Sequence, residues 1–205
     1  MGNQKEEDMN VRKALEWGGF GAGFVLIAFG IVAIVMGVNG RTTVRDSLKA
    51  EQIYFGAAAD PAVAKFAPQW VDEQVQTGDQ ARAFAQVIHE HALGGSDGLT
   101  YSQMGRFVSA DDPESAAGTS DEAAALKDEK GRPVSNAARN TWVTATALST
   151  ALNVSYMAEQ TALFGIVVGI ALLLAGIGFI VLMLVGGLRR PAPAKTGGTA
   201  QPTGA

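Results

Sequence analysis

Hydrophobic and polar positions divide this chain into two long uncharged segments, a polar segment between them and two short ends. The uncharged segments are residues 18–38 and 161–188, which are 21 and 28 residues long. A helix rises about 1.5 Å per residue, so about 20 apolar residues can cross the hydrocarbon core of a bilayer. The pattern therefore predicts an integral membrane protein with two transmembrane helices.

The segment between the spans has the signals of several short helices. Helix starts are predicted where a capping box or an Asp cap occurs, at Thr43, Asp60, Asp79 and Thr100. The third of these helices should stop at Gly94 and Gly95 and should bury one face, which consists of Ala81, Phe84, Ala85, Ile88 and Ala92. Composition predicts a surface loop at residues 109–119 and a turn at residues 128–133.

The character of the chain changes after residue 135. No proline occurs between Pro133 and Pro191, and no glycine occurs between Gly131 and Gly165. We expect one long helix, with an outer part at residues 136–160 that continues into the second span. The predicted fold is an all-α membrane protein in which two transmembrane helices flank a mainly helical extracytoplasmic domain, residues 39–135.

Basic residues near the ends of the spans predict the orientation. Six Lys or Arg residues lie in the terminal segments 1–17 and 189–205, against three close to the first span on the loop side. The positive-inside rule places both termini in the cytoplasm and the loop outside the cell membrane. The proline-containing C-terminal segment is predicted to be a disordered cytoplasmic tail. A cleaved signal peptide is disfavoured, because the first span is long and no small-residue cleavage site follows it.

Small residues form a row along each span. The predicted packing seam consists of Gly23, Gly30 and Gly37 in the first span, and Ala158, Ala162, Gly165, Gly169 and Gly176 in and before the second. Lipid gives helices no hydrophobic reason to associate, so close approach along small residues is a common means of packing. We expect an antiparallel hairpin. Two alternatives stay open: the rows reflect the general abundance of glycine in membrane helices, or they face another subunit.

Composition excludes several functions. Residues 39–160 carry ten Lys or Arg residues against sixteen Asp or Glu residues, so this segment is a poor nucleic-acid-binding surface. The chain has no cysteine, which excludes disulfides and thiolate chemistry. Neither span contains an ionisable residue, so an ion or proton pathway within this chain is not expected.

Candidate metal ligands are few. His89 and His91 are two residues apart, which on a helix means about 200° around the axis, so their side chains should diverge. The acidic residues Asp111, Asp112 and Glu114 do not have the spacing of a calcium loop. We therefore expect no catalytic residues, no metal site and no cofactor.

Two sequence stretches resemble a group of uncharacterised actinobacterial two-span membrane proteins. They are ARAFAQVIHEHALGGSDGLTYSQM, residues 81–104, and TWVTATALSTALNVSYMAEQ, residues 141–160, which a glycine-rich span follows. With the spans, the resemblance covers about half of the chain. Some members carry a ring-opening dioxygenase label, but that chemistry needs a cluster of metal ligands that two divergent histidines do not provide. The resemblance implies the two-span topology and no activity.

Together these patterns favour a non-enzymatic structural or accessory component of a membrane or envelope complex. Its partners would be membrane lipid and either another protein or further copies of itself. The alternative is an extracytoplasmic sensing or ligand-binding module that signals through the long helix.

Overall fold

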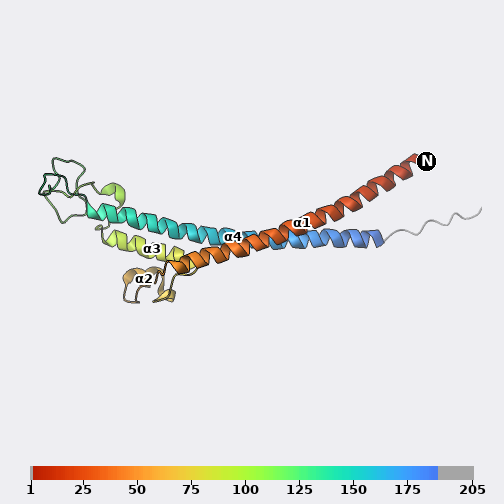
Figure 1. Ribbon diagram of the computed structural model, residues 1–205, viewed down its shortest axis with the longest axis horizontal. Helices are drawn as coiled ribbons and strands as arrows, with labels where there is room; N and C mark the ends of the chain where they lie inside the picture. The colour runs from red at the N-terminus through yellow and green to blue at the C-terminus, as the bar shows by residue number, and fades with distance from the viewer. Residues whose placement is uncertain (1, 189–205) are drawn as a thin grey trace, which may run out of the picture. The chain divides into compact units, whose positions relative to one another are not determined.

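The computed structural model describes residues 2–188, with side chains described at residue 10 and at residues 13–185. Its elements in chain order are α1 (Gly2–Ala50), α2 (Pro61–Phe66), η1 (Pro68–Trp70), α3 (Gly78–Gly94), η2 (Tyr101–Gln103) and α4 (Ala137–Leu188) (Figure 1). Regular secondary structure in this range is entirely helical, as the sequence predicts. The described residues form two compact units, one of residues 2–34 with residues 167–188, the other of residues 35–166. The predicted tail, residues 189–205, lies outside the described range.

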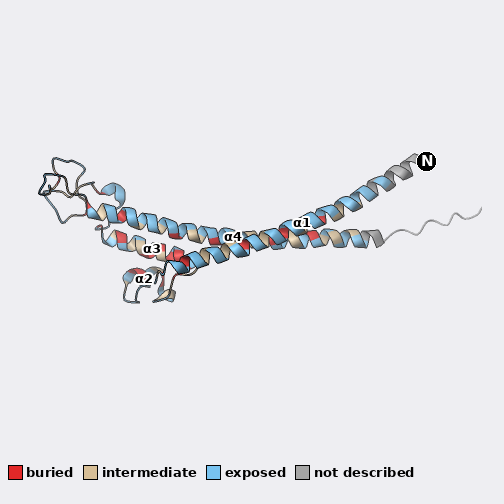
Figure 2. Cartoon of the chain, viewed as in Figure 1, coloured by how far each residue is buried: buried red, intermediate tan, exposed pale blue. Residues whose placement is uncertain are grey.

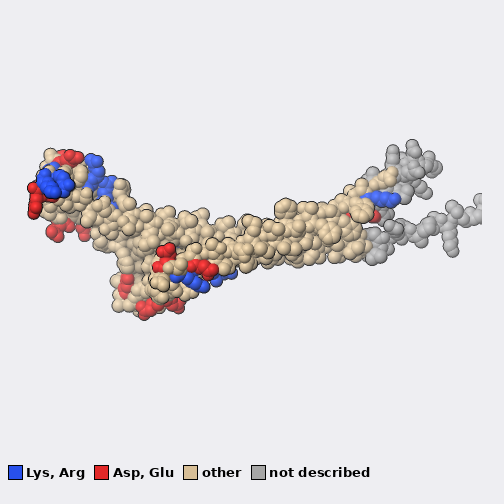
Figure 3. Space-filling model, in the orientation of Figure 1, with Lys and Arg blue, Asp and Glu red and all other residues tan. Residues whose placement is uncertain are grey.

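Two helices, α1 and α4, are long enough and apolar enough to cross a membrane. Their large apolar side chains are mostly exposed: Phe24 is 65% exposed and Phe164 is 67% exposed. On the face that Figure 3 shows, no charged side chain lies along the apolar segments of these two helices. A helix that exposes so much apolar surface does not resemble the core helix of a water-soluble domain.

The first long helix continues past the point where the sequence predicts a new one. Thr43 was expected to cap a separate helix, but α1 runs unbroken to Ala50 and that prediction is wrong. The hydroxyl of Thr43 donates to the carbonyl of Asn39 at 2.9 Å, and Thr42 bonds Val38 in the same way at 3.0 Å. Because both hydroxyls are satisfied four residues back within the helix, they do not stop it.

The short helices form a small core with the C-terminal part of α1 and the N-terminal part of α4. The side chains buried there are Leu48, Phe55, Ala62, Val63, Ala67, Val75, Ala81, Ala83, Ala85, Val87 and Leu152 (Figure 2). Helix α2 begins after the Asp60 cap, as expected. Helix α3 begins after Thr77, whose hydroxyl accepts from the amide of Gln80 at 3.3 Å, so the prediction that Asp79 is the cap is wrong by two residues.

Residues 105–136 form a compact set of turns. Isolated antiparallel bridges join Phe107 to Thr119 and Lys127 to Pro133, and the latter closes the predicted turn at residues 128–133. The buried amide of Asn136 donates to two carbonyl groups of this segment, at 2.9 and 3.1 Å. The start of α4 is thereby tied to the turns that precede it.

Candidate functional site

Four glycines of the predicted rows, Gly23, Gly30, Gly169 and Gly176, lie where the backbones of α1 and α4 approach closely. A Cβ atom on Gly30 would be 2.7 Å from the carbonyl oxygen of Gly169, and a Cβ on Gly169 would be 2.7 Å from that of Gly30. A Cβ on Gly176 would likewise lie 2.6 Å from the carbonyl oxygen of Gly23. All four glycines are buried. The two backbones therefore touch at positions where no side chain fits.

Within the other unit, Gly37 is placed in the same way. A Cβ on it would lie 2.6 Å from the carbonyl oxygen of Ala162 and 2.6 Å from the side chain of Ile166. The other two members of the predicted row lie elsewhere on the helix, since Ala158 is exposed and Gly165 is half-buried. In both cases the next residue of α4 contacts α1 instead: Glu159 follows Ala158, and Ile166 follows Gly165.

Glu159 is the most deeply buried acidic residue among those described, at 6% exposed. One carboxylate oxygen, Oε1, accepts from the Nε atoms of Arg41 at 2.9 Å and Arg45 at 2.7 Å. The other, Oε2, accepts from the backbone amide of Gly78. Three elements, α1, α3 and α4, therefore meet at a single carboxylate. We call these four residues the Glu159 cluster.

The local sequence explains why these groups meet. Arg41 and Arg45 are four residues apart and share one face of α1. Gly78 is the first residue of α3, where backbone amides have no partner within the helix and carry partial positive charge. A Cβ on Gly78 would lie 3.0 Å from Oε2, so glycine lets the carboxylate approach.

The charges of the cluster do not cancel. Two arginine side chains, 41% and 35% exposed, share the carboxylate of a side chain that is 8% exposed. Burial of an acidic group is costly unless it is paired and hydrogen-bonded, and both conditions hold here. The cluster keeps an excess positive charge on its exposed side.

Sequence reasoning missed this site, although one signal was present. Glu159 is the only charged residue in positions 140–188. A single carboxylate in so long an uncharged stretch requires a cationic partner, and Arg41 and Arg45 lie at the corresponding end of the other apolar segment. Pairing these two facts would have nominated the cluster.

The two histidines of α3 point to different neighbours. The ring of His89 lies 5.4 Å from that of Trp142, whereas Nε2 of His91 lies 3.0 and 3.1 Å from the two carboxylate oxygens of Asp60. The hydrogen bond to His91 holds the pKa of Asp60 below its ordinary value. Within the described range no three metal-ligating side chains come together. Asp111, Asp112 and Glu114 are exposed.

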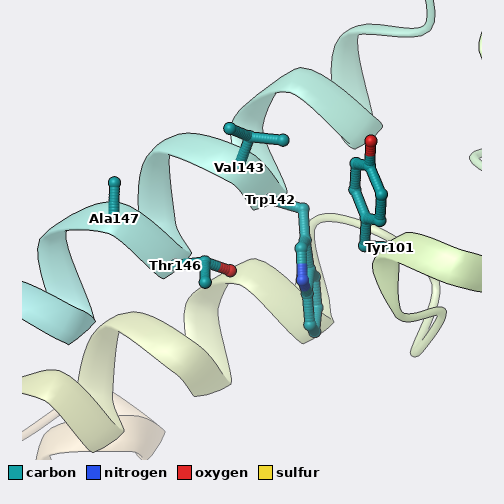
Figure 4. Close-up of a pocket in the computed structure, with 5 residues that line it drawn as sticks. All are labelled: Tyr101, Trp142, Val143, Thr146 and Ala147. Atoms are coloured by element: carbon teal, nitrogen blue, oxygen red, sulfur yellow. The ribbon is translucent and has the colours of Figure 1, made fainter.

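An open apolar groove lies near the start of α4. Tyr101 of η2 and Trp142, Val143, Thr146 and Ala147 of α4 line it, and its volume is about 400 Å³ (Figure 4). The guanidinium group of Arg139 lies 4.1 Å from the ring centre of Tyr101. The lining offers apolar and aromatic contact, with the hydroxyl-bearing side chains of Tyr101 and Thr146 among its residues.

Comparison with known proteins adds no further assignment. The chain matches no model of a protein family, no curated protein and no solved structure.

Proposed function

We propose that this chain is a non-enzymatic integral membrane protein that acts as a structural or accessory component of a membrane or envelope complex. Residues 18–38 and 161–188 would cross the membrane, both termini would be cytoplasmic, and the domain between the spans would lie outside. Its role would be to hold that domain at the membrane surface for a partner protein.

The Glu159 cluster is the observation that carries this proposal. Its carboxylate is committed on both oxygens to groups of the same chain, so it is not presented to a substrate. It joins α3, the longest helix between the two apolar segments, to both long helices near the ends of those segments. Deeply buried charge used in this way supports an anchoring role.

Recovery of a partner tests the accessory role. The tagged chain, extracted in mild detergent, should bring down at least one other membrane or envelope protein at a fixed ratio, identified by mass spectrometry. Recovery of the chain alone, as a monomer, would refute the role.

Topology has a separate test, because the chain has no cysteine and single cysteines can be introduced freely. Asn10→Cys and Ala123→Cys place a thiol at exposed positions before the first span and between the spans. A membrane-impermeant maleimide should label the second variant in intact cells, and the first only after lysis. The reverse pattern would overturn the orientation.

The apolar groove supports one second candidate, a sensing module. A small apolar or aromatic ligand bound against Tyr101 and Trp142 would contact α4 directly, and α4 continues without a break to Leu188. Binding of such a ligand should change the fluorescence of Trp142 in a variant in which Trp17 and Trp70 are replaced by Phe. A flat response across a panel of apolar ligands would leave the accessory role alone.

A further inference from the structure

The outward-facing atoms of the Glu159 cluster have no partner within the described part of the chain. Arg41 and Arg45 reach the carboxylate through Nε, and neither donates a hydrogen bond from its terminal Nη atoms to any described residue. Those Nη atoms are also accessible to solvent. Among the described residues, only the Nε atom of Arg139 is both buried and without a hydrogen-bond partner, so the unpaired Nη atoms of Arg41 and Arg45 are not buried. Two adjacent guanidinium groups thus present free donors to the surroundings.

We propose that Arg41 and Arg45 bind a phosphate group, and that an anionic phospholipid headgroup supplies it. This inference rests on the proposed function, because it needs the apolar segments to lie in a bilayer. A guanidinium group offers several donors in a planar fork that matches the oxygens of a phosphate. Two such groups on one helix face can hold one phosphate between them.

The charge balance favours an anion at this place. Glu159 is the one carboxylate among the described residues that pairs with either arginine, so the cluster keeps one uncompensated positive charge. The acidic residues nearest along the chain are Asp46 in α1 and Glu51 just after it, and neither forms an ion pair with the two arginines. Because Glu159 holds both guanidinium groups in place, little side-chain entropy is lost when an anion binds.

The depth of the cluster selects a lipid as the source of the phosphate. Arg41 lies three residues beyond the end of the apolar segment at Val38, which is about 4.5 Å along a helix. Arginines at the ends of transmembrane helices extend toward the headgroup layer, and anionic lipid attracts such cations. A dissolved phosphate ion would meet the same atoms but would not be concentrated at this depth.

Native mass spectrometry of the purified, delipidated protein in detergent tests the inference. Phosphatidylglycerol and phosphatidylcholine with the same acyl chains are added in turn, and inorganic phosphate is added in a third arm at matched ionic strength. The wild-type protein should retain phosphatidylglycerol in preference to phosphatidylcholine. Arg41→Gln should weaken that binding roughly fivefold, the effect of one cation near a charged headgroup.

Arg106→Gln is the matched control, because Arg106 is exposed and stacks on Phe107 away from the cluster, yet its loss changes the net charge equally. It should bind phosphatidylglycerol as the wild type does. Arg41→Lys keeps the charge without the fork and should fall between the wild type and Arg41→Gln, which provides a test even if the glutamine variant does not fold.

Three results would overturn the inference. They are equal retention of the two lipids by the wild-type protein, an equal loss in Arg106→Gln and Arg41→Gln, and displacement of the lipid by inorganic phosphate. Failure of the proposed function would give a different result from these three. A chain that is soluble in aqueous buffer without detergent does not span a membrane. A membrane-bound chain with no lipid preference refutes only the phosphate site.

Discussion

Removing the charge of Glu159 while keeping its shape is the most direct test of the cluster. In Glu159→Gln the amide oxygen can still accept from the backbone amide of Gly78, but the NH2 group then takes the place of Oε1 and cannot accept from Arg41 and Arg45, so both of these bonds are lost. Because the two arginine side chains are 41% and 35% exposed, water screens both pairs, and each should be worth no more than about 1 kcal/mol. We expect a loss of about 1–2 kcal/mol in unfolding free energy.

Truncation should cost more than loss of charge. Glu159→Ala also leaves the amide of Gly78 without an acceptor, which adds about 1–3 kcal/mol. For a chain of this size 1 kcal/mol corresponds to about 2–4 °C in melting temperature, so Glu159→Gln should melt roughly 2–8 °C lower and Glu159→Ala lower again. The assay is thermal unfolding in detergent followed by circular dichroism.

The control carries the same chemical change at an exposed ion pair. Glu90 pairs with Lys65 at 3.0 Å, with the two side chains 37% and 57% exposed, so Glu90→Gln should stay within about 0.5 kcal/mol of the wild type. The reasoning is refuted if Glu159→Gln melts like the wild type, or if Glu90→Gln is equally destabilised.

Three further changes test other contacts. Gly30→Ile should disrupt the helix pair and shift the protein on native gels, because even a Cβ there meets the opposite backbone at 2.7 Å. Val35→Ile, at an exposed position, should leave the gel unchanged, and identical gels for the two variants would argue against the contact. Gly78→Ala should lower the melting temperature by a few degrees, since its Cβ would press on the carboxylate at 3.0 Å, and an unchanged melt contradicts that geometry. Because His91 lowers the pKa of Asp60, this carboxylate stabilises the fold above its ordinary pKa of 3.8 and loses that contribution as the pH falls through its lowered value. Melts of Asp60→Asn and the wild type should therefore differ at neutral pH and converge in acid, and a difference that persists in strong acid would exclude the linkage.

The long helices could be predicted because their signals are local. Apolar length and the absence of proline are read directly from the chain, and they account for α4 over nearly its whole range. The end of α1 was mispredicted because Thr43 has the same sequence signal whether its hydroxyl caps a helix or bonds the carbonyl four residues back. Local pattern does not distinguish these two states.

The site depended on information that the pattern lacks. The predicted row chose Ala158 because it is small, whereas the contact with α1 at that level involves its neighbour Glu159. Residue size predicts which positions permit close approach but not where a buried charge finds its partners, which lie 118 and 114 positions away in the chain. The bridges in residues 105–136 were missed because the segment has no alternating apolar pattern.

The spacing of the glycine contacts restricts how the two long helices can move. Contacts recur every seven residues on each helix in opposite directions, at Gly23, Gly30 and Gly37 of α1. A slide by one helical turn would set these glycines against different residues and press side chains against backbone. The next matching register is seven residues away, about 10.5 Å along the axis. Small piston-like displacements of one helix along the other would therefore press side chains against the opposite backbone.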